Sequence, residues 1–178
     1  MNEETSKIRI GVARTLARNL LKKAKIKEPP TSLRVVIKYL QEKYNLAVFS
    51  NPTLNHNISG MLVRVNDELL DEQSGGYSEI HYNKKHSWHR NRFTIAHEIG
   101  HLILETSCDK SFLSFDTIKN PIEAEANQFA AELLIPLAFV KKDLKVSGAE
   151  IPQLAWKYIV SQEAMGWKIS SCNLLGRL

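Results

Sequence analysis

The first part of the chain alternates apolar and polar residues with the period of a helix. Apolar side chains recur about every four positions in residues 6–25, and a second such stretch begins after Pro29-Pro30. The prolines interrupt the pattern because proline disfavours helix at the preceding residue, and Thr31 or Ser32 can cap the second helix. We therefore predict two amphipathic helices. Their apolar positions are Ile8, Val12, Leu16 and Leu20 with Ala13, Ala17 and Leu21 alongside, then Leu33, Val36, Ile37 and Leu40.

Three shorter apolar runs come next, at residues 46–49, 59–65 and 78–83. Asn66-Asp67 and Gly75-Gly76 stand between the later runs, and such turn residues predict short strands on either side. The helical period then returns. It predicts helices over about residues 87–105, 121–135, 137–145 and 151–175, with a loop over about residues 106–119. Strands that precede a series of helices predict an α+β fold, with a small three-stranded, mostly antiparallel sheet packed against helices.

Charge is spread unevenly along the 178 residues. Residues 1–47 carry 11 Lys and Arg against 4 Asp and Glu, although the whole chain has a net charge of only +5. We expect a basic N-terminal helix within residues 1–30, followed by one domain over residues 31–178. Arg14, Arg18 and Lys22 form a basic stripe on this helix, which we interpret as a solvated face. Contact with nucleic acid or an acidic protein is the alternative.

The composition also bears on the cellular compartment. No apolar run approaches the roughly 18 residues that would span a bilayer, and the first residues lack the apolar stretch of a signal peptide. Cys108 and Cys172 are far apart and form no CxxC pair, so they predict neither a disulfide framework nor a zinc ribbon. We expect a cytoplasmic protein in a reducing compartment, with no membrane association.

The segment His97-Glu98-Ile99-Gly100-His101 predicts metal chemistry. On a helix His97 and His101 are one turn apart and project from one face, a spacing that suits two ligands of one zinc ion. Glu98 is the neighbour of a ligand, where its carboxylate can take a proton from a metal-activated water molecule as general base. The alternative is two unrelated histidines in a core helix.

A catalytic zinc ion needs a third protein ligand. The third histidine of the metzincins is absent, because position 107 is Ser107. Within the helix predicted over residues 121–135, Glu123 shares a face with Asn127 and the inward-pointing Ala130 and Leu134. A carboxylate among inward-pointing residues is costly unless it is paired or bound to metal, so Glu123 is the predicted third ligand.

Two other carboxylates of the same helix are assigned a different role. Glu125 lies on the opposite side with Gln128 and Glu132, which we interpret as a solvent face. Asn127, one turn after Glu123, can hydrogen-bond a ligand histidine and orient its ring. The alternative for Glu123 is a first-turn carboxylate that interacts only with the helix dipole.

The segments RNRFTIAHEIGHLILE and IEAEANQFAAELLIP together resemble the ImmA/IrrE family of metallo-endopeptidases. LAWKYIVSQEAMGWKI resembles the closing helices of that family, although Trp167-Lys168-Ile169 departs from its usual pattern. The resemblance covers about residues 30–170 and implies a zincin-like fold, a metal held by His97, His101 and Glu123, and Glu98 as catalytic base. It also implies a helix-turn-helix transcriptional repressor as the protein substrate. Zinc suits these ligands, and manganese and iron remain open.

Peptide hydrolysis also requires a donor for the developing oxyanion. Five residues ahead of the metal motif are candidates, without a basis for choosing among them: His81, Tyr82, His86, His89 and Arg92. His81 and Tyr82 are neighbours on a predicted strand, so at most one of them points at the site. That strand, if it lies at a sheet edge, would allow an extended substrate to bind by strand addition.

Two other functions compete with the peptidase. Residues 154–174 have the outline of a helix-turn-helix, with a break at Val160-Ser161. The second helix carries Lys168 among apolar residues such as Met165 and Trp167, so we expect it to pack on the core and expect no direct nucleic-acid binding. The remaining alternative is a metal-binding regulatory protein that sequesters a repressor without cleaving it. The presence of Glu98 favours the enzyme.

Overall fold

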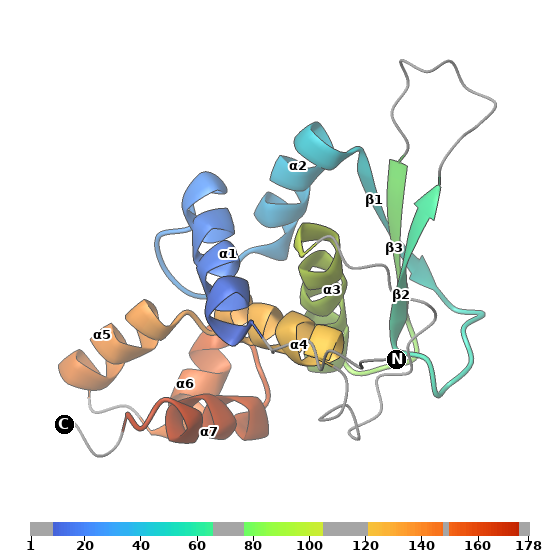
Figure 1. The fold of residues 1–178 in the computed structure, drawn as a ribbon. Helices are drawn as coiled ribbons and strands as arrows, with labels where there is room; N and C mark the ends of the chain where they lie inside the picture. Colours follow the sequence, from blue (N-terminus) through green and yellow to red (C-terminus); the bar gives the residue numbers. More distant parts are fainter. Residues whose placement is uncertain (1–8, 66–76, 105–120, 148–149, 175–178) are drawn as a thin grey trace, which may run out of the picture.

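The computed structural model describes residues 9–65, 77–104, 121–147 and 150–174, and Figure 1 shows its fold. A three-stranded sheet lies at one end of the molecule, and the last three helices lie together at the other. The predicted loop over residues 106–119 falls outside the described residues. The elements are α1 (Ile10–Lys23), α2 (Leu33–Tyr44), β1 (Leu46–Asn51), β2 (Gly60–Val65), β3 (Tyr77–Asn83), α3 (Trp88–Ile103), α4 (Pro121–Leu134), α5 (Leu137–Ser147), α6 (Ile151–Tyr158) and α7 (Gln162–Ser171).

The strands form one mixed sheet in the order β1-β3-β2. β3 pairs parallel with β1 and antiparallel with β2. The α+β fold is therefore confirmed, with one parallel and one antiparallel pairing in the place of a mostly antiparallel sheet. The condition for strand addition at the third strand, a position at the sheet edge, is not met, because β3 has a strand on each side. Among the described strands, β1 and β2 form the two edges of the sheet. The edge strand that runs antiparallel to β3 is β2.

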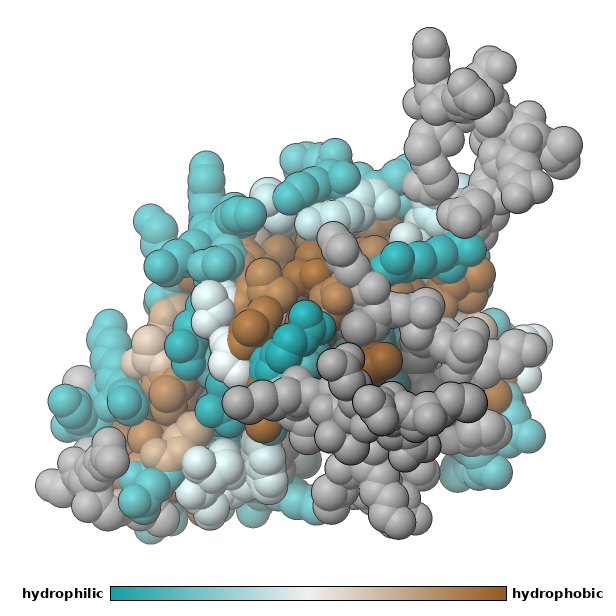
Figure 2. Space-filling model, viewed as in Figure 1, coloured by the Kyte–Doolittle hydropathy of each residue, from teal (hydrophilic) through white to brown (hydrophobic). Residues whose placement is uncertain are grey.

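Helix α3 runs through the centre of the molecule, between the sheet and α4 (Figure 1). Its side chains are buried on nearly all sides, and Leu62 and Ile80 of the sheet share one apolar core with Ile99 of α3 and Phe129 of α4. The outer face of the sheet is more open, since Phe49 is 45% exposed. Figure 2 shows hydrophilic side chains over α1 and α2 and apolar ones between α1 and α3. No described helix is long and apolar enough to cross a membrane.

The N-terminal helix packs closely on α4. Its buried side consists mainly of Ala13, Ala17, Leu20 and Leu21, whereas Val12 is 47% exposed. The buried face of α1 is therefore centred on Ala13 and Ala17, which the sequence analysis placed beside the predicted apolar face, and Val12 lies outside it. Small side chains at the contact allow two helices to approach closely.

Charged side chains join the same two helices, which corrects two predictions. The Arg9 side chain binds Glu125 (Nη2–Oε2, 2.9 Å), Arg14 donates to Gln128 (2.7 Å), and Arg18 donates to Glu132 (2.7 Å). The side of α4 that carries Glu125, Gln128 and Glu132 is thus covered by α1, and it is not a solvent face. Nor is the basic stripe simply solvated, because two of its arginines bind α4.

Glu132 is the most connected of these carboxylates. It is 1% exposed and also accepts a hydrogen bond from Lys168 of α7, which is itself 1% exposed. The backbone N–H of Leu137 at the start of α5 donates to it as well (3.3 Å). One carboxylate therefore joins α1, α4, α5 and α7.

The C-terminal part contains two helices and the predicted break between them. α6 ends at Tyr158, its C-cap Ile159 has positive φ, and the Ser161 side chain caps α7 by accepting from Ala164 N–H (3.1 Å). Met165 and Ile169 are buried, in agreement with the expectation that α7 packs on the core. Trp167 does not take part in this packing, since it is 49% exposed.

Candidate metal centre

The sequence places the histidines of the HExxH segment in the C-terminal half of α3. The helix begins where the Ser87 side chain accepts a hydrogen bond from Arg90 N–H (3.4 Å). His97 and His101 are each 0% exposed and lie on the side that faces α4. A Cβ atom at Gly100 would lie 3.2 Å from the carbonyl oxygen of Ala126 and 3.2 Å from the ring of Phe129. Glycine at this position therefore allows α4 to approach the two histidines.

Helix α4 brings Glu123 and Asn127 to this side of α3. Glu123 is 3% exposed, and its carboxylate oxygens lie 3.1 Å from Nε2 of His97 and 3.3 Å from Nε2 of His101. The side-chain oxygen of Asn127 lies 2.9 Å from Nδ1 of His97. Because an amide oxygen only accepts, Nδ1 carries the proton and the lone pair of His97 is on Nε2, facing Glu123 and His101.

The three groups fit a divalent metal ion. The Nε2 atoms of the two histidines lie 2.9 Å apart, and a set of ligand atoms from His97, His101 and Glu123 falls within 4.8 Å. Zinc bonds of about 2.0–2.1 Å at tetrahedral angles place neighbouring ligand atoms about 3.3 Å apart, close to the distances found here. The Nε2 lone pair of His97 and the carboxylate of Glu123 repel each other at 3.1 Å, and a cation between them removes this repulsion.

The electrostatic environment keeps Glu123 ionised. Burial raises its pKa, but the imidazoles of His101 and His97, when they are protonated and the site holds no metal, outweigh burial and hold the pKa well below its ordinary value. An ionised carboxylate beside two imidazole nitrogens is the state that a metal ligand requires.

Glu98 lies beside this cluster on the side of α3 that faces the sheet. It is 2% exposed, it accepts a hydrogen bond from the backbone N–H of Leu62, and its Oε2 atom has no hydrogen-bond partner among the described residues. Burial raises the pKa of Glu98, an effect that the charges of His97 and His101 partly oppose. A buried carboxylate with a free oxygen and a raised pKa suits a general base.

The strand next to Glu98 contains a glycine for steric reasons. A Cβ atom at Gly60 would lie 2.4 Å from Cγ2 of Thr94, 2.8 Å from the carbonyl oxygen of His81 and 3.6 Å from Oε1 of Glu98. Glycine therefore lets β2 lie against α3, so that Leu62 can reach Glu98. Sequence reasoning did not identify Gly60 or Leu62. A glycine inside a predicted strand was the available sign of a close approach, whereas a backbone N–H leaves no sign in the sequence.

The structure separates most of the proposed oxyanion donors from the metal centre. Arg92 is 7% exposed and donates to the carbonyl oxygens of Thr31 (3.0 Å) and Ile159 (3.2 Å). His86 hydrogen-bonds the carbonyl oxygen of His56 (2.9 Å), and His81 hydrogen-bonds Glu79 (2.8 Å).

The two remaining candidates differ in where the fold places them. His89 lines a groove at the beginning of α3, several turns from the histidine pair. Tyr82 lies opposite Gly60 in the β2–β3 register, on the same face of β3 as the buried Ile80. Of the five, Tyr82 is therefore the residue on the face of the sheet that α3 covers.

Comparison with known proteins identifies the family of the chain. Residues 41–170 match the peptidase M78 family, described as the IrrE N-terminal-like domain. In fold the chain is similar to a transcriptional regulator from Mycobacterium tuberculosis, with a TM-score of 0.63, 12% identity and coverage of 90% of this chain. The match covers 46% of the regulator, so this chain spans about half of its length. No match was found among curated proteins. Since the family match takes in most of the chain, including α3 and α4, the protein belongs to the peptidase M78 family of metallopeptidases.

Proposed function

We propose that this metallopeptidase is a zinc-dependent endopeptidase that cleaves a helix-turn-helix transcriptional repressor, with Glu98 as general base. The observation that carries the proposal is the arrangement of α3 and α4. His97, His101 and Glu123 meet within ligand distance of one another, and Glu98 is buried next to them with one oxygen free of other partners among the described residues.

Each residue has a defined part in the proposed reaction. His97, His101 and Glu123 would hold the metal, and Asn127 would orient the ring of His97. Zinc in this site would supply Lewis-acid chemistry toward water and the peptide carbonyl. Glu98 accepts the proton that the attacking water loses and delivers it to the leaving nitrogen. Its burial favours this exchange, because a raised pKa makes its carboxylate a stronger proton acceptor.

The free edge of β2 is the proposed binding surface for the substrate backbone. Asn83 N–H donates to the carbonyl oxygen of Ser59 (2.8 Å), and these residues are opposite in the antiparallel register. Hydrogen bonding alternates along such a pair, so backbone groups of Gly60, Leu62 and Arg64 point away from β3. An extended peptide can pair with this edge and pass beside Glu98, where Leu62 already makes its contact.

Two arguments support a repressor as the substrate and zinc as the metal. The chain resembles the ImmA/IrrE family, whose members act on helix-turn-helix repressors, and its fold is similar to that of a transcriptional regulator. Two imidazoles and one carboxylate are a ligand set that zinc peptidases use, although manganese and iron accept the same donors. Metal analysis of the purified protein decides among the three.

The test is the substitution Glu98→Gln, which keeps the shape of the side chain and removes the base. We expect cleavage to fall by a factor on the order of 10²–10⁴, because a general base contributes about this much. Metal content should stay near that of the wild type, because Glu98 is not one of the three ligands. Wild type and variant would be loaded with zinc and incubated with helix-turn-helix repressors from neighbouring genes. Fragments would be followed by mass spectrometry.

Each outcome of this experiment separates the hypotheses. Equal cleavage by both proteins would remove Glu98 from the mechanism. Cleavage by neither protein, together with tight binding of a repressor by both, would favour sequestration without hydrolysis. His97→Ala serves as the control that loses the metal.

A further inference from the structure

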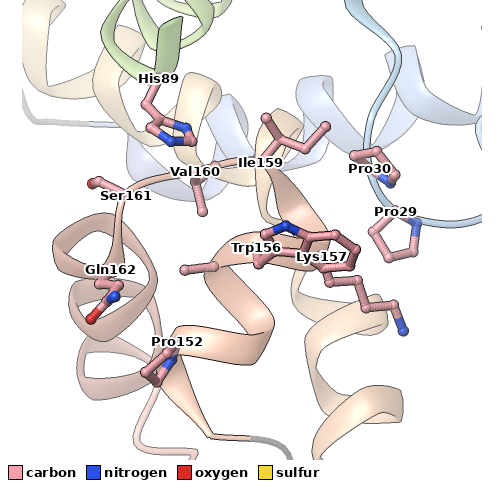
Figure 3. A pocket seen from close by; sticks show the side chains of 11 residues that line it. Pro29, Pro30, His89, Pro152, Trp156, Lys157, Ile159, Val160, Ser161 and Gln162 are labelled. Carbon is pink, nitrogen blue, oxygen red and sulfur yellow. The ribbon is translucent and has the colours of Figure 1, made fainter. Parts of the chain in front are cut away.

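A groove of about 910 Å³ lies between the chain segment joining α1 to α2 and the pair α6–α7 (Figure 3). Pro29 and Pro30 lie at one end of the groove, Trp156 lies between them and Val160, and His89 at the beginning of α3 lies at the other end, beside Val160 and Ser161. Trp156 is 84% exposed, more than any other large hydrophobic side chain among the described residues. A tryptophan so exposed beside two prolines is typical of an interaction surface, because an isolated indole is normally covered.

The two walls of the groove are held in place by Arg92. Its buried guanidinium donates to the carbonyl oxygen of Thr31, the residue after Pro30, and to that of Ile159, which lines the other wall. Arg92 belongs to α3, so the helix with the metal ligands also sets the distance between the walls. The groove therefore exists before any partner binds, which lowers the cost of binding.

The groove residue His89 is the neighbour of Arg90, which contacts the start of the proposed substrate edge of β2. The Arg90 side chain donates twice to Oγ of Ser59 (3.0 and 2.7 Å), and Ser59 directly precedes β2. Further along, Thr94 faces Gly60 and Glu98 accepts from Leu62, so β2 and α3 run side by side in the same direction. A peptide that follows β2 past Gly60 therefore leaves the sheet next to Arg90 and His89.

The lining residues indicate the chemistry of the occupant. None of them is acidic, and the charge of Lys157 is balanced by Asp143, whose Oδ1 lies 2.7 Å from its Nζ. Most of the remaining lining consists of proline rings, an indole and aliphatic side chains, and the uncharged polar side chains of Ser161 and Gln162 lie with His89 at one end. Such a surface favours an apolar segment in extended conformation.

We propose that this groove is an exosite that binds an extended, apolar segment of the protein substrate, continuous with the stretch that pairs with β2. The proposal rests on the peptidase function proposed above. His89 and Glu98 are nine residues apart on α3, or about 14 Å along the helix. An extended chain covers about 3.3 Å per residue, so the segment begins roughly four residues from the scissile bond.

The experiment measures binding separately from cleavage. Phage-displayed random 16-residue peptides are selected on the full-length Glu98→Gln protein loaded with zinc. Selected peptides are then synthesised. Their affinity is measured for the Glu98→Gln protein and for the same protein that also carries Trp156→Ala. We expect them to carry a shared apolar motif and to bind the Trp156→Ala protein at least 10-fold more weakly. Trp167→Ala is the matched control, because Trp167 is also exposed but does not line the groove.

The outcomes distinguish the exosite from the peptidase function. Equal binding to both tryptophan variants, or the absence of any selected peptide, would overturn the exosite. Peptides that need Trp156 but resist the wild-type enzyme would uphold the groove and count against the proposed hydrolysis. Peptides that need Trp156 and are cleaved about four residues from the motif would support both proposals.

Discussion

Two carboxylates of α4, only two residues apart, differ in what faces them. Glu123 and Glu125 are equally buried, at 3% exposure each. Glu123 faces two imidazoles of α3, whereas Glu125 accepts hydrogen bonds from the backbone and side chain of Arg9 (2.8 and 2.9 Å). Burial therefore does not distinguish the proposed metal ligand Glu123 from Glu125, whereas the chemistry of their neighbours does.

This difference predicts opposite effects of the same substitution. Glu123→Gln should strongly lower the zinc content, because it replaces a charged ligand with a neutral amide. Glu125→Gln should leave the zinc content near that of the wild type and loosen the contact between α1 and α4. Elemental analysis of the purified variants measures the first effect, and hydrogen exchange of α1 measures the second. Normal zinc in Glu123→Gln with loss in Glu125→Gln would show that the assignment is wrong.

At the scale of elements, the closest approach near the site is between β2 and α3. Gly60→Ala would place a methyl group 2.4 Å from Cγ2 of Thr94, so β2 must move away from α3 and from Glu98. We expect a loss of about 1–3 kcal/mol of stability from overpacking and a lower rate of cleavage with normal zinc content.

Two further variants make this prediction specific. Thr94→Ser in the Gly60→Ala background removes the clashing Cγ2 and should recover part of the stability. Gly166→Ala is the control, because its nearest atom would be 3.8 Å away and alanine favours the helix. Urea unfolding gives the free energy of unfolding of Gly60→Ala, of Gly60→Ala with Thr94→Ser, and of Gly166→Ala. A Gly60→Ala protein as stable as the wild type would exclude the contact between β2 and α3 as a constraint.

Helices and strands with a regular pattern were predictable from the sequence, but the side chains that contact them from other elements were not. The prediction of α2, the three strands and α3 was correct because periodicity and capping residues act locally. The helical phase of α4 correctly placed Glu123 and Asn127 on one side. The same phase could not reveal what covers Glu132, because its partner Arg18 lies 114 residues away in the chain. A side with three polar residues therefore resembled a solvent face.

At the scale of the whole molecule, the contacts of Glu132 tie together four helices. It accepts from Arg18 of α1 and Lys168 of α7, and from the backbone N–H of Leu137 at the start of α5. Burial raises the pKa of Glu132, but Lys168 and Arg18 outweigh burial and hold the pKa below its ordinary value of 4.5. Removing one partner of such a buried pair costs about 3–5 kcal/mol, because the remaining charge is left uncompensated.

This pKa predicts how the stability of the fold depends on pH. Between its folded pKa and 4.5, Glu132 is ionised in the folded chain but largely protonated in the unfolded chain. The unfolded chain binds more protons there, so the stabilisation is complete above pH 4.5 and is lost as the pH falls through the folded pKa. One such group changes the free energy of unfolding by up to about 1.4 kcal/mol per pH unit. Glu132→Gln should remove this part of the acid sensitivity and lower stability at neutral pH.

The control for the acid experiment is Gln128→Ala, on the same side of α4. It removes the hydrogen bond from Arg14 without removing a titrating group, so it should lower stability by a similar amount at every pH. Urea unfolding of both variants and the wild type between about pH 3 and pH 7 gives the free energy of unfolding of each protein, and its slope against pH is then compared among the three. If Glu132→Gln kept the wild-type slope, acid unfolding would have to begin elsewhere. A smaller slope for Glu132→Gln alone would identify this carboxylate as a group whose protonation releases α1, α4, α5 and α7 from one another.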